Sequence, residues 1–313
     1  MNITLILDMR LRAFLSQAQD LNDFLIANQL TDGTAELWLF YAGGKPDALP
    51  KMVCNLRRVV WISLASPGLA EQQLEALVQG FPQYPSDLLL FASDELATRL
   101  ACRLRGVSST GVTHAAREEQ HWRVEHPAYG NRVQVRLELA GFPLCISVAA
   151  SGSQPAQTAH FTGVQETLSP VFAAPEWLVK IEQEPLEVDD GLRNASYILA
   201  VGQGAGSVEN LRALEIIAAK LGAEVGVSRP VAMNAWCGMS RMLGVSGVIA
   251  APKVCIVAGA SGAAALMAGL DHSEFIVAVN TDPQAAIFAQ ADVGIVGDLH
   301  ETLEALSHYL TRT

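Results

Sequence analysis

The sequence predicts an α/β fold in two domains, and three observations support this prediction. The chain has 313 residues and is 50% apolar, which is enough to build two cores. Apolar runs of strand length alternate with stretches whose apolar residues recur at helical spacing, a pattern typical of parallel βαβ units. In the second half the strand-like runs are continuously apolar, which indicates a parallel sheet covered by helices on both faces.

The first domain is expected over residues 1–150, as a parallel α/β domain with an antiparallel extension. The predicted strands are Ile3–Leu7, Glu36–Tyr41, Val59–Leu64 and Asp87–Phe91, and the predicted helices are Leu11–Leu30, Leu69–Phe81 and Glu95–Leu104. Polar and apolar residues then alternate in His121–His126 and Arg132–Leu139, and Pro143–Val148 follows. These three segments are predicted to form the antiparallel extension.

Residues 151–188 are predicted to be a linker, because they are rich in Ser, Gln, Ala and Pro and show little periodicity. The second domain is expected over residues 189–313 and to be doubly wound. Its predicted strands are Tyr197–Val201, Ala223–Val227, Lys253–Ala258, Phe275–Val279 and Val293–Val296. Ser207 is expected to cap a helix whose apolar face carries Leu211, Leu214, Ile217, Ala218 and Leu221, and a last helix carries Leu299, Leu303, Leu306 and Leu310.

Charge and composition exclude several classes of protein. A formal net charge of −11 argues against nucleic acid as a partner, since phosphate binding needs clustered Lys and Arg. The five cysteines contain no Cys-x-x-Cys pair, which indicates free thiols rather than disulfides or a metal site. The uncharged stretch Val254–Leu270 is interpreted as a buried strand and helix, not a membrane span. Met1–Asp8 has no basic region and is interpreted as a first strand, so a cytoplasmic protein is expected.

Two glycine-rich turns follow predicted strands in the second half. Gly202-Gln-Gly-Ala-Gly206 follows a strand and opens a helix, so its backbone N–H groups could hold a phosphate, although glycines also serve plain tight turns. Gly259-Ala-Ser-Gly262 is a second such turn. Two glycine turns in one sheet suit an extended pyrophosphate. The alternative interpretation of the second turn is that its small residues allow close packing of a helix against the sheet. Glu224 has the spacing of a ribose-binding acid from the first turn but stands at the start of its strand, which opposes a Rossmann-type dehydrogenase.

Polar residues also follow other predicted strands. Ser228 and Arg229 bring a hydroxyl and a cation to the carboxyl edge of the sheet, where open α/β sheets bind nucleotides. Asn280 ends a strand and can bond a ligand, or it forms a turn before Asp282-Pro283. Asp298 can contact a ligand or cap the last helix.

In order and spacing, these segments resemble the FAD-binding domain of the electron-transfer flavoprotein alpha subunit, together with Gly244-Val-Ser-Gly247 and Ala291–Asp298. A fainter resemblance in the first half rests on Leu88–Ala92, Arg99–Leu104 and Pro127–Gly130. The resemblance implies a Rossmann-like FAD-binding domain, a heterodimer with a beta-like subunit, and electron shuttling from a dehydrogenase donor to an acceptor. Such a protein is an electron carrier in which the cofactor performs the chemistry, so no catalytic residue is expected.

The same resemblance implies which residues hold FAD. They are Gly202, Gln203, Gly204, Ser228, Arg229, Val245, Ser246, Gly259, Ser261, Gly262, Asn280 and Asp298. Arg229 is expected against the isoalloxazine ring, where a fixed cation stabilises the anionic reduced forms. Ser246 is expected near the flavin edge and Asn280 at the adenosine half.

Three positions depart from the family pattern. Gln203 replaces the arginine of Gly-Arg-Gly, Val245 replaces the glutamine of Gly-Gln-Thr-Gly, and Ala265-Leu266 replaces a Gln-His pair. A lost charge-assisted hydrogen bond is worth about 1.5–3 kcal/mol. Two hypotheses follow: an electron-transfer flavoprotein alpha-like subunit that still binds FAD, or a flavin-free paralogue that acts as a nucleotide-binding or scaffolding subunit.

Overall fold

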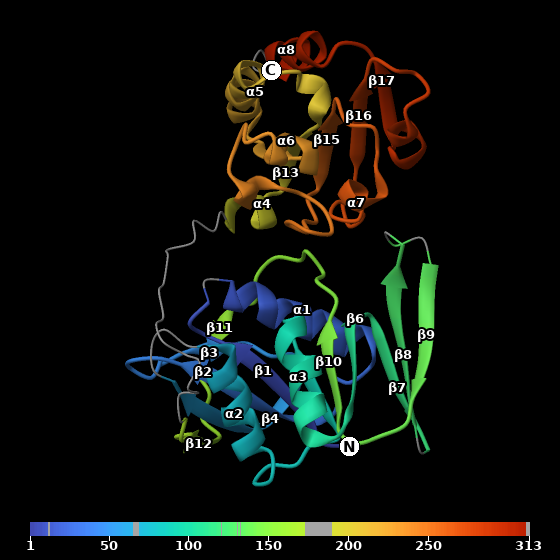
Figure 1. Ribbon diagram of the computed structural model, residues 1–313. Helices are drawn as coiled ribbons and strands as arrows, with labels where there is room; N and C mark the ends of the chain where they lie inside the picture. The colour runs from blue at the N-terminus through green and yellow to red at the C-terminus, as the bar shows by residue number, and fades with distance from the viewer. Residues whose placement is uncertain are drawn as a thin grey trace. The chain divides into compact units, whose positions relative to one another are not determined.

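The computed structural model describes residues 1–11, 13–64, 69–119, 121–129, 131, 133–172 and 190–310 (Figure 1). The chain divides into two compact units, one formed mostly by residues up to 172 and the other mostly by residues 190–310. Each unit has its own parallel sheet and its own pair of hydrophobic clusters.

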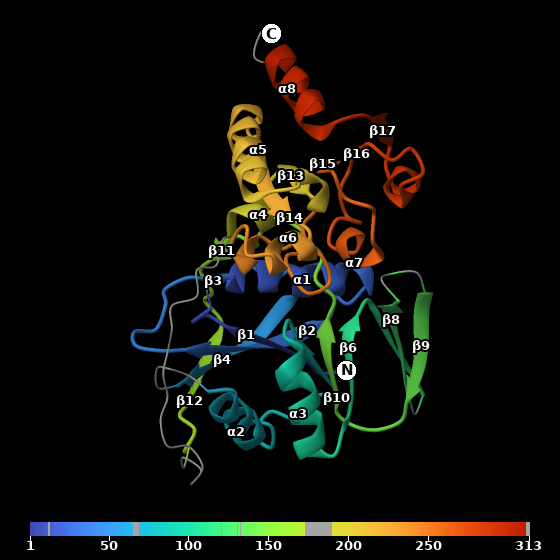
Figure 2. The same cartoon turned by 45° about the horizontal axis from the view of Figure 1, so that its top comes forward.

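A seven-stranded parallel sheet forms the centre of the first unit, in the order β12-β4-β2-β1-β5-β10-β6. Its strands are β1 (Ile3–Asp8), β2 (Thr34–Tyr41), β4 (Asn55–Ser63), β5 (Leu88–Phe91), β6 (Val107–Val112), β10 (Leu144–Val148) and β12 (Val164–Leu168). Figure 2 shows helix α1 (Phe14–Ala27) on one side of the sheet and α2 (Ala70–Gly80) and α3 (Asp94–Leu104) on the other. Side chains alternate accordingly: Leu5 and Leu7 pack in the cluster that includes α1, and Ile6 packs with α2 and α3.

A separate three-stranded antiparallel sheet is formed by β7 (His114–Glu118), β8 (His121–Ala128) and β9 (Val133–Leu139). This sheet confirms the predicted extension for two of its three segments. The third prediction is wrong, because β10 pairs in parallel with β5 and β6 inside the large sheet. The physical reason is burial: all five residues of β10 are buried, as expected of a strand with both faces covered.

The predicted linker differs from the structure in its first part. It contains β11 (Thr158–Ala159), which pairs with β3 (Leu49–Pro50), and β12, which extends the large sheet beside β4. Both strands carry mainly exposed or half-buried residues at sheet edges, so they show no continuous apolar run in the sequence. Residues 173–189 of the predicted linker lie outside the described residues.

The second unit contains a five-stranded parallel sheet in the order β14-β13-β15-β16-β17. Its strands are β13 (Tyr197–Val201), β14 (Glu224–Val227), β15 (Val254–Ala258), β16 (Ile276–Asn280) and β17 (Val293–Val296). The helices are α4 (Asp190–Asn194), α5 (Val208–Leu221), α6 (Arg229–Met233), α7 (Ala264–Met267) and α8 (Leu299–Leu310), with 3-10 turns η1 (Gln203–Ala205), η2 (Met239–Arg241) and η3 (Ala286–Gln290). Counted from its own first strand, the sheet has the doubly wound order 2-1-3-4-5.

Alternation along β13 shows that both faces of this sheet are covered. Leu199 and Val201 pack in a cluster with residues of α5 and α8, whereas Ile198 and Ala200 pack in a cluster with residues of α4 and α7. The doubly wound fold predicted from continuous apolar strands is therefore confirmed. The predicted cap is also present, since the Ser207 hydroxyl accepts a hydrogen bond from the Asn210 N–H at 3.2 Å.

Within the described residues, no helix has both the length and the apolar character needed to cross a membrane. Val254–Leu270, interpreted from the sequence as a strand and a helix, forms β15, the glycine turn and α7.

The five free cysteines give a direct test of burial. Burial raises the pKa of the Cys145 and Cys255 thiols to about 12, whereas Cys102 is exposed. Because the thiolate is the reactive form, iodoacetamide at pH 8 (about the pKa of a free thiol) should label Cys102 and spare Cys145 and Cys255 in the folded protein. Mass spectrometry of labelled peptides measures this, and labelling in denaturant should modify all three. Prompt labelling of Cys255 in the folded chain would contradict its burial.

Candidate functional site

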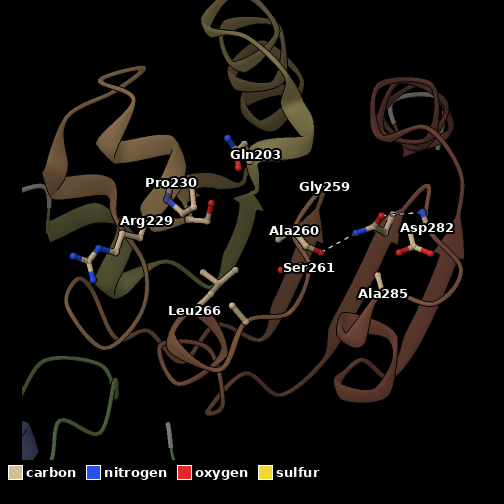
Figure 3. A pocket seen from close by; sticks show the side chains of 12 residues that line it. Gln203, Arg229, Pro230, Gly259, Ala260, Ser261, Leu266, Asp282 and Ala285 are labelled. Carbon is tan, nitrogen blue, oxygen red and sulfur yellow. Dashed lines mark hydrogen bonds between the residues drawn. The ribbon is translucent and has the colours of Figure 1, made fainter. Parts of the chain in front are cut away.

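The candidate site lies at the carboxyl edge of the second unit's sheet. After β13 the chain first forms β14 on one side, and later enters β15 on the other side, so the strand order reverses between β13 and β15. Open α/β sheets bind ligands in the crevice at this point. A cavity of about 360 Å³ is found here, lined by residues that follow β13, β14, β15 and β16 (Figure 3).

The two glycine turns meet at the base of this site. The Gly204 N–H donates to the Gly259 carbonyl at 2.9 Å. A Cβ atom on Gly202 would lie 2.2 Å from that same carbonyl oxygen, so a side chain cannot be accommodated without moving backbone. Gly259 has φ of +67°, in the region that favours glycine. The first turn therefore uses Gly202 and Gly204 for close backbone contact with the second turn.

The second turn carries backbone donors beside the cavity. Gly259 donates its N–H to Val279 of β16. No residue in the described part of the chain accepts a hydrogen bond from the N–H groups of Ala260, Ser261 or Gly262. Ala260 and Ser261 line the cavity. Successive free N–H groups in a turn form a concavity suited to an anion such as a phosphate.

Ser228 brings a buried hydroxyl to the same cavity. Its N–H donates to Val201 and its carbonyl accepts from Val231, so the backbone is held firmly where β14 meets α6. The residue is only 7% exposed, yet its Oγ has no hydrogen-bond partner among the residues described. Leaving a buried hydroxyl unpaired costs about 1–3 kcal/mol. A polar ligand in the cavity would supply the missing partner.

Charge is distributed unevenly along the cavity. Figure 3 shows Arg229 and Asp282 at opposite ends, with Leu266 between them. Within residues 190–310, neither Arg229 nor Asp282 forms an ion pair. Leu266 is only 6% exposed and apolar. The cavity thus has Arg229 at one end, with its guanidinium directed away from Leu266 in Figure 3, a carboxylate at the other end and an apolar wall between.

Asn280 connects the ends of two neighbouring strands. Its Nδ2 donates to the Ala260 carbonyl at 2.9 Å, and its Oδ1 accepts from the Asp282 N–H at 3.0 Å. The turn role considered in the sequence is therefore present, and the side chain also lines the cavity. Asn280 fixes the loop after β16 against the glycine turn after β15.

The structure brings half of the expected site residues into the lining of one cavity. These are Gln203, Ser228, Arg229, Gly259, Ser261 and Asn280. Gly202, Gly204 and Gly262 belong to the adjoining turns. Six lining residues are absent from the site expected from the sequence: Pro230, Ala260, Ala263, Leu266, Asp282 and Ala285. Their available signal was position, since all stand within a few residues of a strand end or a glycine turn.

Three expected residues lie elsewhere. Val245 and Ser246 are not part of the cavity lining; Val245 is 61% exposed and its N–H donates to the Ala265 carbonyl at 2.9 Å. Asp298 is also outside the lining. Its Oδ1 accepts hydrogen bonds from the N–H groups of His300 at 2.8 Å and Glu301 at 3.1 Å, so it caps α8, the alternative weighed in the sequence.

Comparison with known proteins agrees with this architecture. Residues 191–271 match the family described as the electron transfer flavoprotein FAD-binding domain. A solved structure of a thiamine diphosphate-dependent 4-hydroxybenzoylformate decarboxylase from Rhodococcus jostii RHA1 is 14% identical, over 93% of this chain and 62% of that one, with a TM-score of 0.24, too low to bear on fold or function.

Three proteins of Escherichia coli are similar over most of the chain. YgcQ of strain K12, named as an electron transfer flavoprotein subunit, is 42% identical over 79% of this chain and 86% of that protein. YdiR of the same strain, named in the same way, is 32% identical over 74% and 75%. Protein FixB of E. coli O7:K1 (strain IAI39 / ExPEC) is 33% identical over 69% and 70%. With this identity and coverage, and with its family match in the second unit, the chain belongs to the electron transfer flavoprotein alpha subunit family.

Proposed function

We propose that the second unit binds FAD in the cavity at the switch point, and that the chain is the alpha-type subunit of an electron transfer flavoprotein. The observation that carries this proposal is the buried, unpartnered Ser228 hydroxyl, which faces a cavity bounded by two interlocked glycine turns. Family membership supports FAD as the ligand, because the matching family is described by its FAD-binding domain.

The residues present fit a dinucleotide. The free N–H groups of Ala260, Ser261 and Gly262 would hold the pyrophosphate, and the Ser228 hydroxyl would gain a hydrogen-bond partner. Arg229 would lie at the flavin end, and Asn280 would position the loop at the adenosine end. FAD when bound supplies the electron-accepting and electron-donating chemistry, and the protein sets its orientation and its reduction potential.

The cavity carries little positive charge. Among the described residues that line it, Arg229 is the single cation; Gln203 is neutral and Leu266 is apolar. Backbone N–H groups therefore provide most of the attraction for the phosphates, and Arg229 offsets negative charge at the flavin end. This division of roles makes Arg229 the main side chain that tunes the potential.

We further propose a beta-type subunit as the partner in a heterodimer, a dehydrogenase as the electron donor, and the cytoplasm as the location. Relatives named as electron transfer flavoprotein subunits support the heterodimer. The protein would then act as an electron carrier between other enzymes, with no substrate of its own.

A second candidate is a flavin-free subunit that serves as a scaffold or binds a smaller nucleotide. The observation in its favour is the chemistry of the cavity wall, where Leu266 and Gln203 offer no charge. It predicts a colourless protein even when FAD is added.

The visible absorption spectrum of the purified chain distinguishes these candidates, measured alone and co-produced with a beta-type subunit. A flavin spectrum whose chromophore is released as FAD on denaturation would support the electron carrier. Absence of flavin in both preparations, even after FAD is added, would exclude FAD binding and leave the flavin-free subunit.

Replacing Ser228 with alanine should separate ligand binding from folding. We expect FAD affinity to fall about tenfold, the effect of one lost hydrogen bond, while the unfolding free energy of the ligand-free chain stays equal or rises. The reason is that the hydroxyl is unpaired without a ligand. FAD fluorescence titration and urea unfolding measure the two effects.

Ser273→Ala is the matched control. Its hydroxyl is likewise buried without a partner, but the residue does not line the cavity. FAD affinity should not change in this variant. If the Ser228→Ala variant binds FAD as tightly as the natural chain does, the Ser228 hydroxyl does not contact FAD.

A further inference from the structure

Asp282 stands in a defined relation to the second glycine turn. β15 ends at Ala258 and is followed by the turn Gly259–Gly262; β16 is the next strand of the sheet and ends at Asn280. Asp282 comes two residues later, and twenty residues after Gly262. In dinucleotide-binding sheets, an acid about 20 residues beyond the glycine turn, at the carboxyl end of the neighbouring strand, accepts a hydrogen bond from a ribose hydroxyl. Glu224 fails this relation for the first turn, and Asp282 satisfies it for the second.

The backbone of Asp282 is tied directly to that turn. The Asp282 N–H donates to Asn280 Oδ1 at 3.0 Å, and Asn280 Nδ2 donates to the Ala260 carbonyl at 2.9 Å. One side chain therefore spans from the phosphate-binding turn to the acid. This arrangement holds the carboxylate at a set separation from the free N–H groups of Ala260 and Ser261.

The carboxylate has an acceptor oxygen left for a ligand. Asp282 Oδ1 accepts from the Gln284 N–H at 2.9 Å, which is an ordinary turn interaction. Oδ2 has no hydrogen-bond donor among the described residues, and the side chain lines the cavity from an exposed position at its rim. A turn role explains one oxygen and leaves the other unused.

A second, independent observation marks this cavity as a ligand site. The Ser228 hydroxyl lines it from the other side of the glycine turn, is 7% exposed and has no partner. Because Arg229 lies at the far end from Asp282, negative groups of a ligand are favoured there and opposed at the Asp282 end (Figure 3). The Asp282 end suits a neutral hydrogen-bond donor.

We propose that Asp282 is a specificity-determining residue that accepts a hydrogen bond from a ribose hydroxyl of a nucleoside diphosphate whose phosphates lie on the turn Gly259–Gly262. The inference rests on the proposed function, in which this ligand is the adenosine diphosphate half of FAD. It assigns to the site a nucleotide with a free ribose diol, and it predicts rejection of a ribose that carries a 2′-phosphate, which would meet the carboxylate.

The test is isothermal titration calorimetry on the purified full-length chain with ADP, 2′-deoxy-ADP, 3′-deoxy-ADP and 2′-phosphoadenosine 5′-diphosphate. The natural chain should bind ADP about tenfold more tightly than the weaker of the two deoxy analogues, and bind the 2′-phosphorylated ligand most weakly. Asp282→Asn keeps an acceptor for the Gln284 N–H but lacks the charge. This variant should bind ADP about tenfold more weakly than the natural chain does. It should also lose the preference for ADP over the deoxy analogues and the preference for ADP over the 2′-phosphorylated ligand.

Glu274→Gln is the control, since it makes the same charge change outside the cavity lining. It should keep the full preference for ADP. The preference among ribose analogues is the deciding readout, because a purely structural role of Asp282 would weaken all four ligands equally. The inference is overturned if the natural chain binds ADP and both deoxy analogues equally tightly, a result that does not depend on the folding of any variant. It is also overturned if the Asp282→Asn variant keeps the preference for ADP over the deoxy analogues.

A parallel FAD fluorescence titration separates this inference from the proposed function. FAD binding without any ribose preference would leave the proposed function standing and overturn the role of Asp282. ADP binding with the expected preference but without FAD binding would support the role of Asp282 in ribose recognition and overturn the proposal that the chain binds FAD. Binding of neither ligand would overturn both.

Discussion

Replacing Gly202 with alanine should abolish tight FAD binding and lower the unfolding free energy of the second unit by about 1–3 kcal/mol. The added Cβ would lie 2.2 Å from the Gly259 carbonyl oxygen and 2.5 Å from the Ala260 N, both backbone atoms that cannot rotate away. The clash must therefore push the second turn outward. That turn carries the free N–H groups proposed to hold the pyrophosphate, so stability and binding should fall together.

Gly238→Ala is the matched control for this prediction. Gly238 has φ of −65°, which alanine adopts freely, and the nearest atom to an added Cβ is the Ser240 Oγ at 3.5 Å. This variant should bind FAD normally and unfold at the natural urea concentration. FAD retention and urea unfolding measure both variants. A Gly202→Ala chain that retains FAD at natural affinity would show that the two turns are not coupled as their contact indicates.

Replacing Arg229 with glutamine should lower the reduction potential of bound flavin by about 60 mV, which corresponds to a tenfold change in a one-electron equilibrium. In the part of the chain that the structure describes, Arg229 is the one cation of the cavity lining, and no carboxylate pairs with it. Its charge is thus available to offset negative charge on reduced flavin. Removing it disfavours the reduced form, so the potential falls. Arg229 is exposed, and solvent screening keeps the effect moderate.

Reductive titration against a reference dye measures this shift. Arg229→Lys keeps the charge and should shift the potential less, and Lys253→Gln removes a charge outside the cavity lining and should leave the potential unchanged. An unchanged potential in Arg229→Gln would place the flavin away from this end of the cavity.

Much of the fold could be predicted from periodicity alone. Tyr197–Val201 and Val293–Val296 match β13 and β17 to the residue, because runs of apolar residues between glycine or polar breaks leave little choice of boundary. Strands at sheet edges are harder to predict from the sequence than central strands are. β12 reads Val-Gln-Glu-Thr-Leu with mostly exposed residues, and its place beside β4 comes from a pairing distant in sequence.

The site could be predicted only in part. Ser228, Arg229 and Asn280 were expected because each directly follows or ends an apolar strand, and they line the candidate cavity because parallel strands deliver such residues to one edge. Asp298 stands at the end of a strand too, but a helix starts immediately after it and takes its carboxylate as a cap. Leu266 and Ala285 carry no polar signal, so only the folded arrangement shows that they face the cavity.

By itself the sequence determined the class of fold, the positions of the central strands and the two glycine turns, since these follow from local pattern and from the conformational freedom of glycine. The tertiary structure decided what those turns do. It placed Gly202 against Gly259, left the Ser228 hydroxyl unpaired beside them, and brought Asp282 to the cavity through Asn280. Contacts of this kind join residues far apart in the chain, and their energies depend on distances that no local pattern encodes.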